Sequence, residues 1–535
     1  MPSLNVHIKH AGKTHDVQLD TDRPPIVFKD SIYQVTGVPP ERMKDDTDWK
    51  KVAPKEGQTF MVIGAAGELP KPPEKPIVFL EDMDDSELAQ ALAYPVGLVN
   101  LGNTCYMNST VQALRAIPEL QTALQASPPP GLPTQLKNLY KTMSSTVDEV
   151  TPTPFLLSLR EAFPQFAEMS RSGNKMMGGG YAQQDAEECW VQLLGSLRDV
   201  PGLPGPSGSG ASKRFIEQYL TGEVRRELTC DEAPEEPASV TTEKVLKIEC
   251  NITINTNYMH SGIMDALDVK IEKASPSLGR DAVYSSKTRL SRLPSYLTVH
   301  MVRFAWRRDI EKKAKIMRKV KFPTEFDALD LVTDDLKAKL TPVSRKLKEI
   351  ESQRGERRKV RKRTKAAAEA SSSSTGKGKG REDADVEMSD ANAGEGSKKE
   401  VKEGEEEKEE VAGGELEEES VYRERETKEL EALVHPDLKA DTGCSVAGLY
   451  ELVAIVTHKG AAADAGHYMG FVKRSVFHPV SHSPTEPGLP DDDEDWYKFD
   501  DNKVSIFPKE KLATLDGGGE DSAAYVLLYR AKPLA

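Results

Sequence analysis

Residues 97–109 read GLVNLGNTCYMNS, a polar, glycine-containing approach that leads directly to Cys105. After it, apolar residues recur at helical spacing from Met107 to Ala116, and Pro118 closes the pattern. A thiol at a helix N-terminus has a lowered pKa and yields the nucleophilic thiolate, because unpaired N–H groups and the helix dipole favour an anion. The pattern predicts a reactive cysteine. The alternative, a buried apolar cysteine, fits the polar approach less well.

A thiolate nucleophile needs a base, and the base needs a group that orients it. His467 lies in the sequence AGHYMGFVK, which predicts a short strand that opens near the histidine. The later sequence WYKFDDNKV predicts a second strand that ends at Asp500 and Asp501. Two adjacent antiparallel strands would bring Asp500 beside the imidazole. His458 is the competing base, but it lacks this flanking pattern.

Three motifs and a C-terminal segment resemble the ubiquitin-specific protease family of deubiquitinases. Residues 97–109 resemble its cysteine box, and YAQQDAEE at 181–188 resembles its glutamine-aspartate box. Gly-His-Tyr at 466–468, with the later WYKFDD, resembles its histidine box. The sequence AYVLLYR at 524–530 is similar to the closing strand of the family. The resemblance covers residues 94–535, apart from one insertion.

The resemblance implies a catalytic role for four residues. Cys105 is the implied nucleophile, and His467 is the implied general base and later general acid. Asp500, rather than Asp501, is the implied orienting carboxylate. Asn100 matches the side chain that helps to stabilise the oxyanion, a contribution of about 2.7–4 kcal/mol for one fixed donor.

The implied fold is α+β, the papain-like cysteine protease arrangement of ubiquitin-specific proteases with thumb, palm and fingers. Its helical lobe would carry Cys105 together with Gln184 and Asp185, which match positions that grip the extended ubiquitin tail. Its β-rich lobe would carry the histidine box, in which Tyr468 borders the channel to the nucleophile. The implied reaction is hydrolysis of the isopeptide or peptide bond after the C-terminal glycine of ubiquitin, through a thioester and without a cofactor.

A catalytically silent, ubiquitin-binding regulator of the proteasome is the alternative from another functional class. Members of the family can be held inactive by loops over the tail channel, and residues 460–465 resemble such a loop. The intact residues Cys105, His467 and Asp500 favour the enzyme. Labelling of Cys105 by a ubiquitin with a C-terminal electrophile would discriminate between the two.

Composition narrows the possible partners and the compartment of this 535-residue chain. The net charge of −14 disfavours nucleic acid as the main partner. No apolar run is long enough for a membrane span, and Met1–His10 lacks the apolar core of a signal peptide. Five cysteines without regular spacing indicate a reducing compartment. We therefore expect a cytoplasmic and nuclear, proteasome-associated protein.

The cysteines also bear on metal binding. Many family members hold a structural zinc with two Cys-x-x-Cys pairs in the fingers, but the matching region here offers only Cys230 and Cys250, each alone. Two thiols cannot close a tetrahedral zinc site, and the spacing of His260 fits no known pattern. We expect no metal site.

Residues 1–66 resemble a ubiquitin-like domain, with a hairpin over residues 4–19, a helix over 24–37 and a closing strand over 59–64. Such a domain before a ubiquitin-specific protease is similar to the proteasome-associated members of the family, which implies the proteasome regulatory particle as a partner. The sequence after Lys44 departs from the family pattern, and this departure predicts that one strand of the domain is missing there.

The remaining segments were assigned by composition. Residues 67–93 form a proline-containing linker before the catalytic domain at 94–535. A charged insertion at about 345–430 begins with a basic run at 357–363 and ends in an acidic tract at 403–419. Its low apolar content predicts a disordered loop, and nuclear localisation or docking is the alternative interpretation of the basic run.

Overall fold

The chain forms two compact units, Met1–Met83 and Asp84–Ala535, each of which is described by itself. The computed structural model describes residues 3–40, 43, 49, 53–63, 83–92, 94–126, 128–169, 180–205, 213–307, 311–374, 417–462, 465–478, 488–490 and 493–534. Within these residues, no helix combines the length and the apolar character that a bilayer crossing requires.

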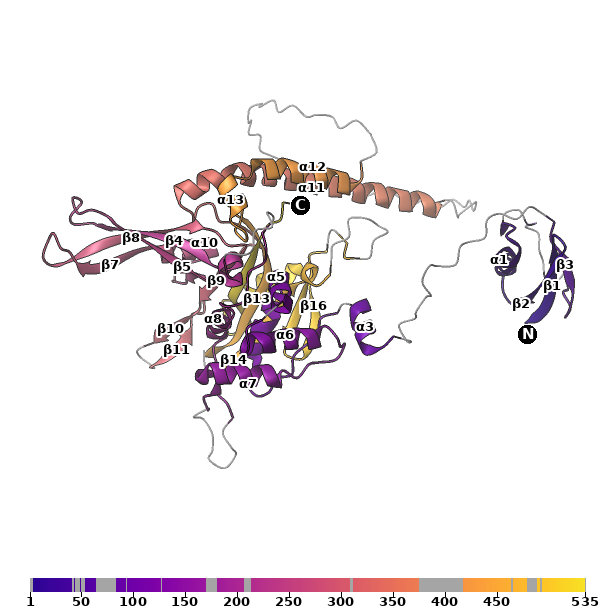
Figure 1. Ribbon diagram of the computed structural model, residues 1–535, viewed down its shortest axis with the longest axis horizontal. Helices are drawn as coiled ribbons and strands as arrows, with labels where there is room; N and C mark the ends of the chain where they lie inside the picture. Colours follow the sequence, from indigo (N-terminus) through magenta and orange to yellow (C-terminus); the bar gives the residue numbers. More distant parts are fainter. Residues whose placement is uncertain are drawn as a thin grey trace, which may run out of the picture. The chain divides into compact units, whose positions relative to one another are not determined.

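The first unit is a small sheet with a helix packed against it (Figure 1). Strands β1 (Leu4–His10) and β2 (Lys13–Leu19) form an antiparallel hairpin, and β3 (Thr59–Met61) pairs in parallel with β1. Helix α1 (Pro25–Thr36) ends at Gly37, whose left-handed backbone (φ 71°) caps the helix. The buried core consists of Val6, Ile8, Val17, Leu19, Phe28 and Ile32.

The expected loss of a strand after Lys44 stays a prediction. The described residues between α1 and β3 contain no strand. However, residues 41–42, 44–48 and 50–52 lie outside the described part of the chain, and so does most of the expected linker.

The second unit begins with a helical lobe. Its helices are α3 (Asp85–Leu92), α4 (Cys105–Leu114), α5 (Pro118–Ala126), α6 (Leu132–Met143), α7 (Thr153–Ala162), α8 (Ala186–Ser196) and α9 (Phe215–Tyr219), with a 3-10 helix at Pro164–Ala167. Every residue of α4 is buried, so this helix forms the centre of the lobe.

A large sheet lies beside the helical lobe. Ten described strands contribute to it, and its main path runs β16-β15-β14-β13-β17-β9-β6. These strands are β6 (Ile248–Asn251), β9 (Tyr296–Val302), β10 (Phe304–Arg307), β11 (Lys312–Lys315), β12 (Glu325–Asp327), β13 (Leu449–Ala462), β14 (Ala465–Lys473), β15 (Trp496–Asp500), β16 (Lys503–Phe507) and β17 (Ala523–Ala531). Short helices flank it at α10 (Met259–Leu267), α13 (Pro436–Ala440), Arg474–Val476 and Lys509–Asp516.

A separate sheet projects from this body in Figure 1. Its order is β5-β4-β8-β7, with bounds β4 (Gly222–Cys230), β5 (Ser239–Val245), β7 (Asp268–Ala274) and β8 (Asp281–Arg292). The expected division into a helical thumb, a β-rich palm and β fingers is therefore present.

The expectation of a disordered insertion at 345–430 is wrong for the parts that the structure describes. Helix α11 (Asp334–Ser374) and helix α12 (Glu419–Leu433) lie side by side in Figure 1, and residues 375–416 between them lie outside the described part. A small core holds the helix pair to the sheet. Its buried members are Val343, Leu347, Ile350, Leu430, Val434, Ala447 and Leu449.

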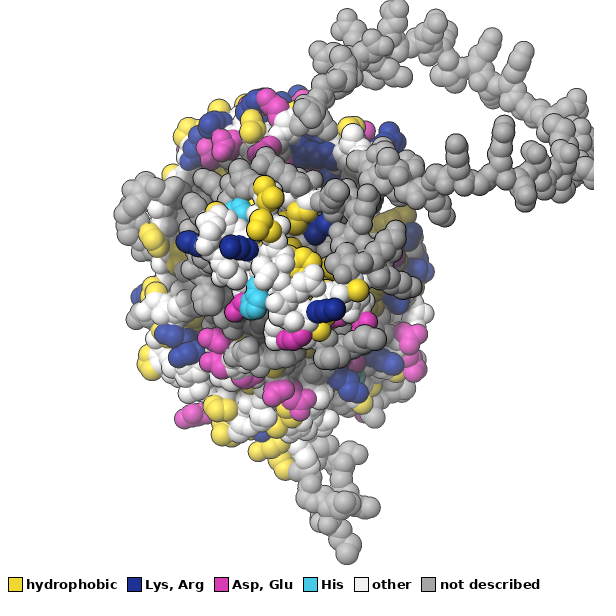
Figure 2. Space-filling view, turned by 90° about the vertical axis from the view of Figure 1, so that its right-hand side faces the viewer, with side chains coloured by type: hydrophobic (Ala, Val, Ile, Leu, Met, Phe, Trp, Pro, Cys, Tyr) yellow, Lys and Arg dark blue, Asp and Glu magenta, His cyan; other side chains and the backbone are white. Residues whose placement is uncertain are grey.

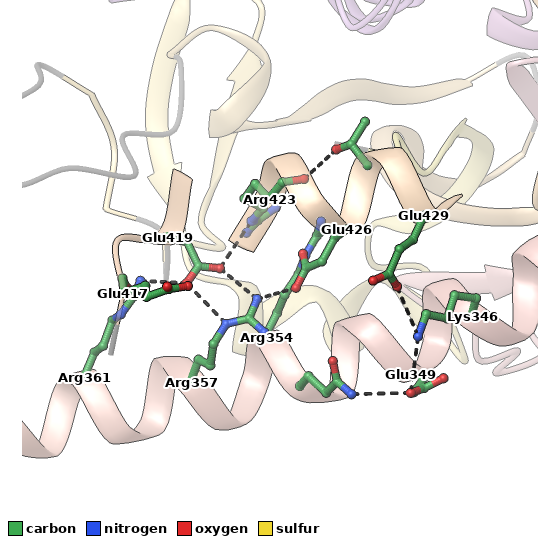
Figure 3. A network of polar contacts seen from close by, with 12 residues as sticks. Lys346, Glu349, Arg354, Arg357, Arg361, Glu417, Glu419, Arg423, Glu426 and Glu429 are labelled. Atoms are coloured by element: carbon green, nitrogen blue, oxygen red, sulfur yellow. Dashed lines mark hydrogen bonds and ion pairs between the residues drawn. The ribbon is translucent and has the colours of Figure 1, made fainter. Parts of the chain in front are cut away.

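Beyond this core, charged side chains join the two helices (Figure 3). Arg354 Nε donates to Glu426 at 2.7 Å, and both side chains are more than nine-tenths buried. Arg357 bonds Glu426 at 2.6 Å and Glu419 at 3.1 Å, and Arg361 bonds Glu419 at 2.6 Å. Two members of the basic run, Arg357 and Arg361, therefore help to join the helix pair. Composition alone missed this because few apolar residues at helical spacing suffice when their charged neighbours pair.

Charges of both signs are mixed on the face drawn in Figure 2. Among the described residues of that face, basic and acidic side chains lie interspersed.

Candidate active site

Cys105 is the first residue of α4, and its side chain is buried. Two residues in the left-handed backbone region, Gly102 (φ 94°) and Asn103 (φ 56°), turn the chain into the helix. Thr104 takes the N-cap position, but its side chain makes no hydrogen bond to the N–H groups of the first turn. The helix dipole and these N–H groups therefore act on the sulfur without a competing side-chain cap.

His467 and Asp500 come from neighbouring strands. Strand β14 pairs antiparallel with β15, and His467 Nε2 lies 2.7 Å from Asp500 Oδ1. Lys498 Nζ lies 3.2 Å from the other oxygen of Asp500. This contact occupies one ring nitrogen of His467 and leaves Nδ1 for the sulfur of Cys105.

The charges around the imidazole favour its protonated form. The hydrogen bond with the Cys105 sulfur is the largest influence, and together with Asp500 it raises the pKa of His467 to about 9 against the opposing effect of burial. Burial disfavours ionisation of Asp500, but His467 and Lys498 outweigh it and lower the pKa of Asp500. The geometry suits a thiolate and imidazolium pair held by a carboxylate.

A glycine brings the strand of the histidine against the helix of the cysteine. An added Cβ at Gly470 in β14 would lie 3.2 Å from the carbonyl oxygen of Ser109 in α4. A side chain there would push the two elements apart and lengthen the reach from His467 to Cys105.

His458 is not placed to serve as the base. It lies in β13 and is fully buried, with its ring edge-on to Tyr468 and Phe304 at 4.8 and 5.1 Å between centroids. Burial, then Lys315 and His467, lower the pKa of His458 to about 4. A neutral, enclosed imidazole fills space below Gly466, where an added Cβ would lie 2.5 Å from His458 Nε2.

Asn100 is fixed by four hydrogen bonds before any substrate binds. Its Nδ2 donates to Asp501 at 2.8 Å, and its Oδ1 accepts from the backbone of Gly102 and Thr104 and from the Thr104 hydroxyl. Asn108 Nδ2 donates to the other oxygen of Asp501, also at 2.8 Å. The two adjacent aspartates therefore divide their tasks: Asp500 holds the imidazole and Asp501 holds two amides.

The expected tail-gripping residues lie next to this centre. Asp185 caps α8 by accepting from Glu187 N–H at 2.8 Å, and it accepts from the hydroxyl of Tyr525 at 2.8 Å. Gln184 is half-buried directly before it. Tyr468 is buried, and within the described residues its hydroxyl has no hydrogen-bond partner.

Sequence reasoning missed the part that three residues play around the catalytic groups. Asp501, considered only as an alternative to Asp500, holds Asn100; Asn108 in turn holds Asp501, and Gln183 lies beside Cys105. All three residues lie within the motifs that resemble the family, so the motifs themselves pointed to these positions. The contacts themselves join segments that are far apart in sequence and could not be inferred from spacing.

The structure brings no second set of metal ligands together. In the described part of the chain, the group of three potential ligands within reach of one another is His467, Asp500 and Asp501. Cys230 belongs to a cluster at the fingers, whereas Cys250 lies in the core beneath the sheet. The two cysteines therefore do not face one site.

The chain is similar to known proteins over nearly its whole length. Residues 96–529 match the family model described as ubiquitin carboxyl-terminal hydrolase. Ubiquitin carboxyl-terminal hydrolase 6 of Schizosaccharomyces pombe is 39% identical over 99% of this chain and 100% of its own. Ubiquitin carboxyl-terminal hydrolase 7 of Arabidopsis thaliana is 35% identical, covering 99% of each chain. Ubiquitin carboxyl-terminal hydrolase 14 of Caenorhabditis elegans is 28% identical, covering 99% of this chain and 94% of its own.

Proposed function

The chain belongs to the ubiquitin carboxyl-terminal hydrolase family, and we propose that Cys105, His467, Asp500 and Asn100 are its catalytic residues. It is a deubiquitinating cysteine protease with the papain-like α+β fold of ubiquitin-specific proteases and an N-terminal ubiquitin-like domain. Its substrates are ubiquitin conjugates. The observation that carries the residue assignment is the 2.7 Å contact between His467 Nε2 and Asp500, with Cys105 as the other partner of the imidazole.

In the proposed reaction, the Cys105 thiolate attacks the carbonyl carbon of the C-terminal glycine of ubiquitin. The carbonyl oxygen takes up the negative charge, and the amide of Asn100 stabilises it. Imidazolium His467 protonates the leaving amine, and a thioester to Cys105 remains. His467 then takes a proton from water, which attacks the thioester and releases free ubiquitin and the thiolate.

The extended tail of ubiquitin would reach Cys105 past Gln184, Asp185 and Tyr468. The carboxylate of Asp185 can accept hydrogen bonds from N–H groups of the extended tail. Tyr468 is buried beside this path. Substitution of Asp185 should therefore raise KM more than it lowers kcat.

The proteasome regulatory particle is the proposed partner, and a cytoplasmic and nuclear location is proposed with it. The support is a ubiquitin-like domain placed before a ubiquitin-specific protease domain. Co-purification of the chain with proteasomes from cytoplasmic and nuclear fractions tests this proposal, and absence from both would contradict it.

Resting inactivity is a second possibility, favoured by one observation. The side chain of Cys105 is only 3% exposed, and Tyr468 beside it is 1% exposed. A nucleophile enclosed in this way fits a protein that is silent until a partner opens the channel. The test is labelling of Cys105 by ubiquitin with a C-terminal electrophile, with and without proteasomes. Labelling without proteasomes contradicts resting silence, and labelling under neither condition contradicts the catalytic assignment.

A further inference from the structure

Gln183 bridges the two lobes at the nucleophile. Its Oε1 accepts from the backbone N–H of Gly466 at 3.1 Å, one residue before His467. Its Nε2 lies 4.0 Å from the sulfur of Cys105. One half-buried amide therefore contacts both the segment that carries the base and the thiol that the base serves.

The orientation of this amide is set by its partners. The N–H of Gly466 is a donor, so it faces the carbonyl oxygen of Gln183, and the NH2 group faces the sulfur. A flipped side chain would set two donors against each other at Gly466 and place an oxygen against the thiolate. The favoured arrangement presents an N–H to the anionic form of Cys105.

Both ends of the bridge are held in place. The segment before Gln183 is tied down by a hydrogen bond from Asn103 Nδ2 to the carbonyl of Tyr181 at 2.9 Å. On the other side, an added Cβ at Gly466 would lie 2.3 Å from the carbonyl oxygen of Lys459. Gln183 therefore lies between a hydrogen-bonded segment of the helical lobe and a glycine that packs closely on strand β13.

We propose that Gln183 is a positioning residue for the nucleophile, which donates a hydrogen bond to the Cys105 sulfur and favours the thiolate. The proposal rests on the catalytic role proposed for Cys105. A neutral thiol accepts such a hydrogen bond weakly and a thiolate accepts it strongly, so the donor stabilises the charged form. The same amide ties the backbone beside His467 to the helical lobe.

Several titratable groups face the Cys105 sulfur and act on the same equilibrium. His467, with Asp500 behind it, supplies the positive charge that favours the thiolate. Burial raises the pKa of both Tyr106 and Tyr468, so these two phenols remain neutral near pH 7 and add no charge. A change at Gln183 alters the donor while it leaves these groups in place.

The variant Gln183→Glu tests the proposal. Its carboxylate keeps the acceptor for the Gly466 N–H but replaces the donor at the sulfur with a negative charge. The readout is the rate of Cys105 alkylation by iodoacetamide against pH in the full chain, with Cys105→Ala as the blank for the other cysteines. The midpoint should move up by about one pH unit, so that the rate falls about ten-fold at any pH well below the wild-type midpoint.

Controls separate this role from others. Gln121→Glu makes the same chemical change on α5, where the side chain bonds the Arg115 carbonyl, and it should leave the pH profile unchanged. Gln183→Met removes the donor without adding charge and should shift the midpoint in the same direction, by less. Gln183→Met also tests the proposal by itself if the Gln183→Glu variant does not fold. Ubiquitin affinity, measured in a Cys105→Ala background, should stay within about two-fold for both Gln183 variants.

The outcomes are distinct. An unchanged alkylation profile in both folded Gln183 variants overturns the proposal. Lost ubiquitin affinity with an unchanged profile would make Gln183 a tail-binding residue instead. If Cys105 of the wild-type protein is no more reactive than a free cysteine thiol, the proposed catalytic function fails first, whatever Gln183 does.

Discussion

The side-chain nitrogen of Asn100 lies 2.8 Å from a carboxylate oxygen of Asp501, 401 positions later in the chain. The donor proposed to meet the oxyanion is therefore held by a residue from the opposite lobe before ubiquitin arrives. Asp501 has a left-handed backbone (φ 52°), and its carboxylate accepts from the amides of Asn100 and Asn108, whereas that of Asp500 contacts the imidazole. Preorganisation of this kind limits the reorganisation needed when charge develops on the substrate.

Substitution of the nucleophile should separate catalysis from binding. Cys105→Ala removes the sulfur that forms the thioester, so hydrolysis of ubiquitin conjugates should fall below detection. Ubiquitin affinity should change by no more than about two-fold. Turnover and affinity are measured on the same preparation, and Cys444→Ala, a half-buried thiol outside the site, is the control that keeps activity. Turnover in a clean Cys105→Ala sample would contradict the assignment.

Substitutions of the two adjacent aspartates should affect catalysis in different ways. Asp500→Asn removes the charge that holds protonated His467, so kcat should fall about 10²–10⁴-fold and the pKa of the imidazole should drop. Asp501→Asn should lower kcat less, because it weakens the hydrogen bond that holds the side chain of Asn100. The pKa of the imidazole should stay unchanged in this variant. Steady-state kinetics with NMR titration of His467 measures both effects. A larger loss at Asp501 would show that fixing Asn100 matters more than orienting the base.

A buried carboxylate in the sheet should make stability depend on acid pH. Burial of Glu451 disfavours ionisation, but Arg530 and Lys473 outweigh it and lower its pKa to about 2. Because the folded-state pKa is depressed, this stability is present above the unfolded pKa near 4.5 and is lost as pH falls toward 2.

The variant Glu451→Gln should therefore lose about 2 kcal/mol of unfolding free energy at pH 7, and the difference from wild type should shrink between pH 4.5 and 2. Denaturant titrations at a series of pH values measure the free energy of unfolding of both proteins. Glu494→Gln, which changes an exposed partner of Lys509, is the control. A difference that does not vary with pH would contradict the ion-pair origin.

The helix pair α11 and α12 should depend on its buried charges. Glu426→Gln leaves Arg354, which is 7% exposed, without its acidic partner, and should cost about 3 kcal/mol of unfolding free energy. The exposed pair Lys359–Glu356 on the same helix offers a matched control, and Glu356→Gln should have no measurable effect. Denaturant unfolding of both variants is the measurement, and equal midpoints would show that the network is not stabilising.

The shortened N-terminal unit should weaken proteasome docking. If a strand is missing after Lys44, part of a docking face is missing with it. Activation should then require a higher proteasome concentration than in a version with a complete ubiquitin-like domain, while the catalytic domain keeps its own chemistry. The measurement is ubiquitin-substrate cleavage titrated with inhibited proteasomes for both versions. Equal half-saturation points would mean that the segment does not contribute to docking.

Local sequence motifs were enough to predict the catalytic groups. Cys105 lies at a helix start that its own turn residues specify, and His467 and Asp500 lie on strands with clear patterns. The α+β class follows from the same elements. The helix pair α11 and α12 was beyond sequence reasoning, because its order depends on a few apolar residues that become buried in a cluster with Ala447 and Leu449, which lie far from α11 in sequence.

The sequence by itself determined which residues are proposed to carry the chemistry, because a nucleophile at a helix N-terminus and a histidine at the start of a strand require particular neighbours along the chain. Only the tertiary structure decided how they cooperate. Asn100 meets Asp501, and Gln183 meets Gly466, across the boundary between the two lobes. Such contacts depend on how helix α4 packs against strand β14, and packing joins residues that no spacing along the chain relates.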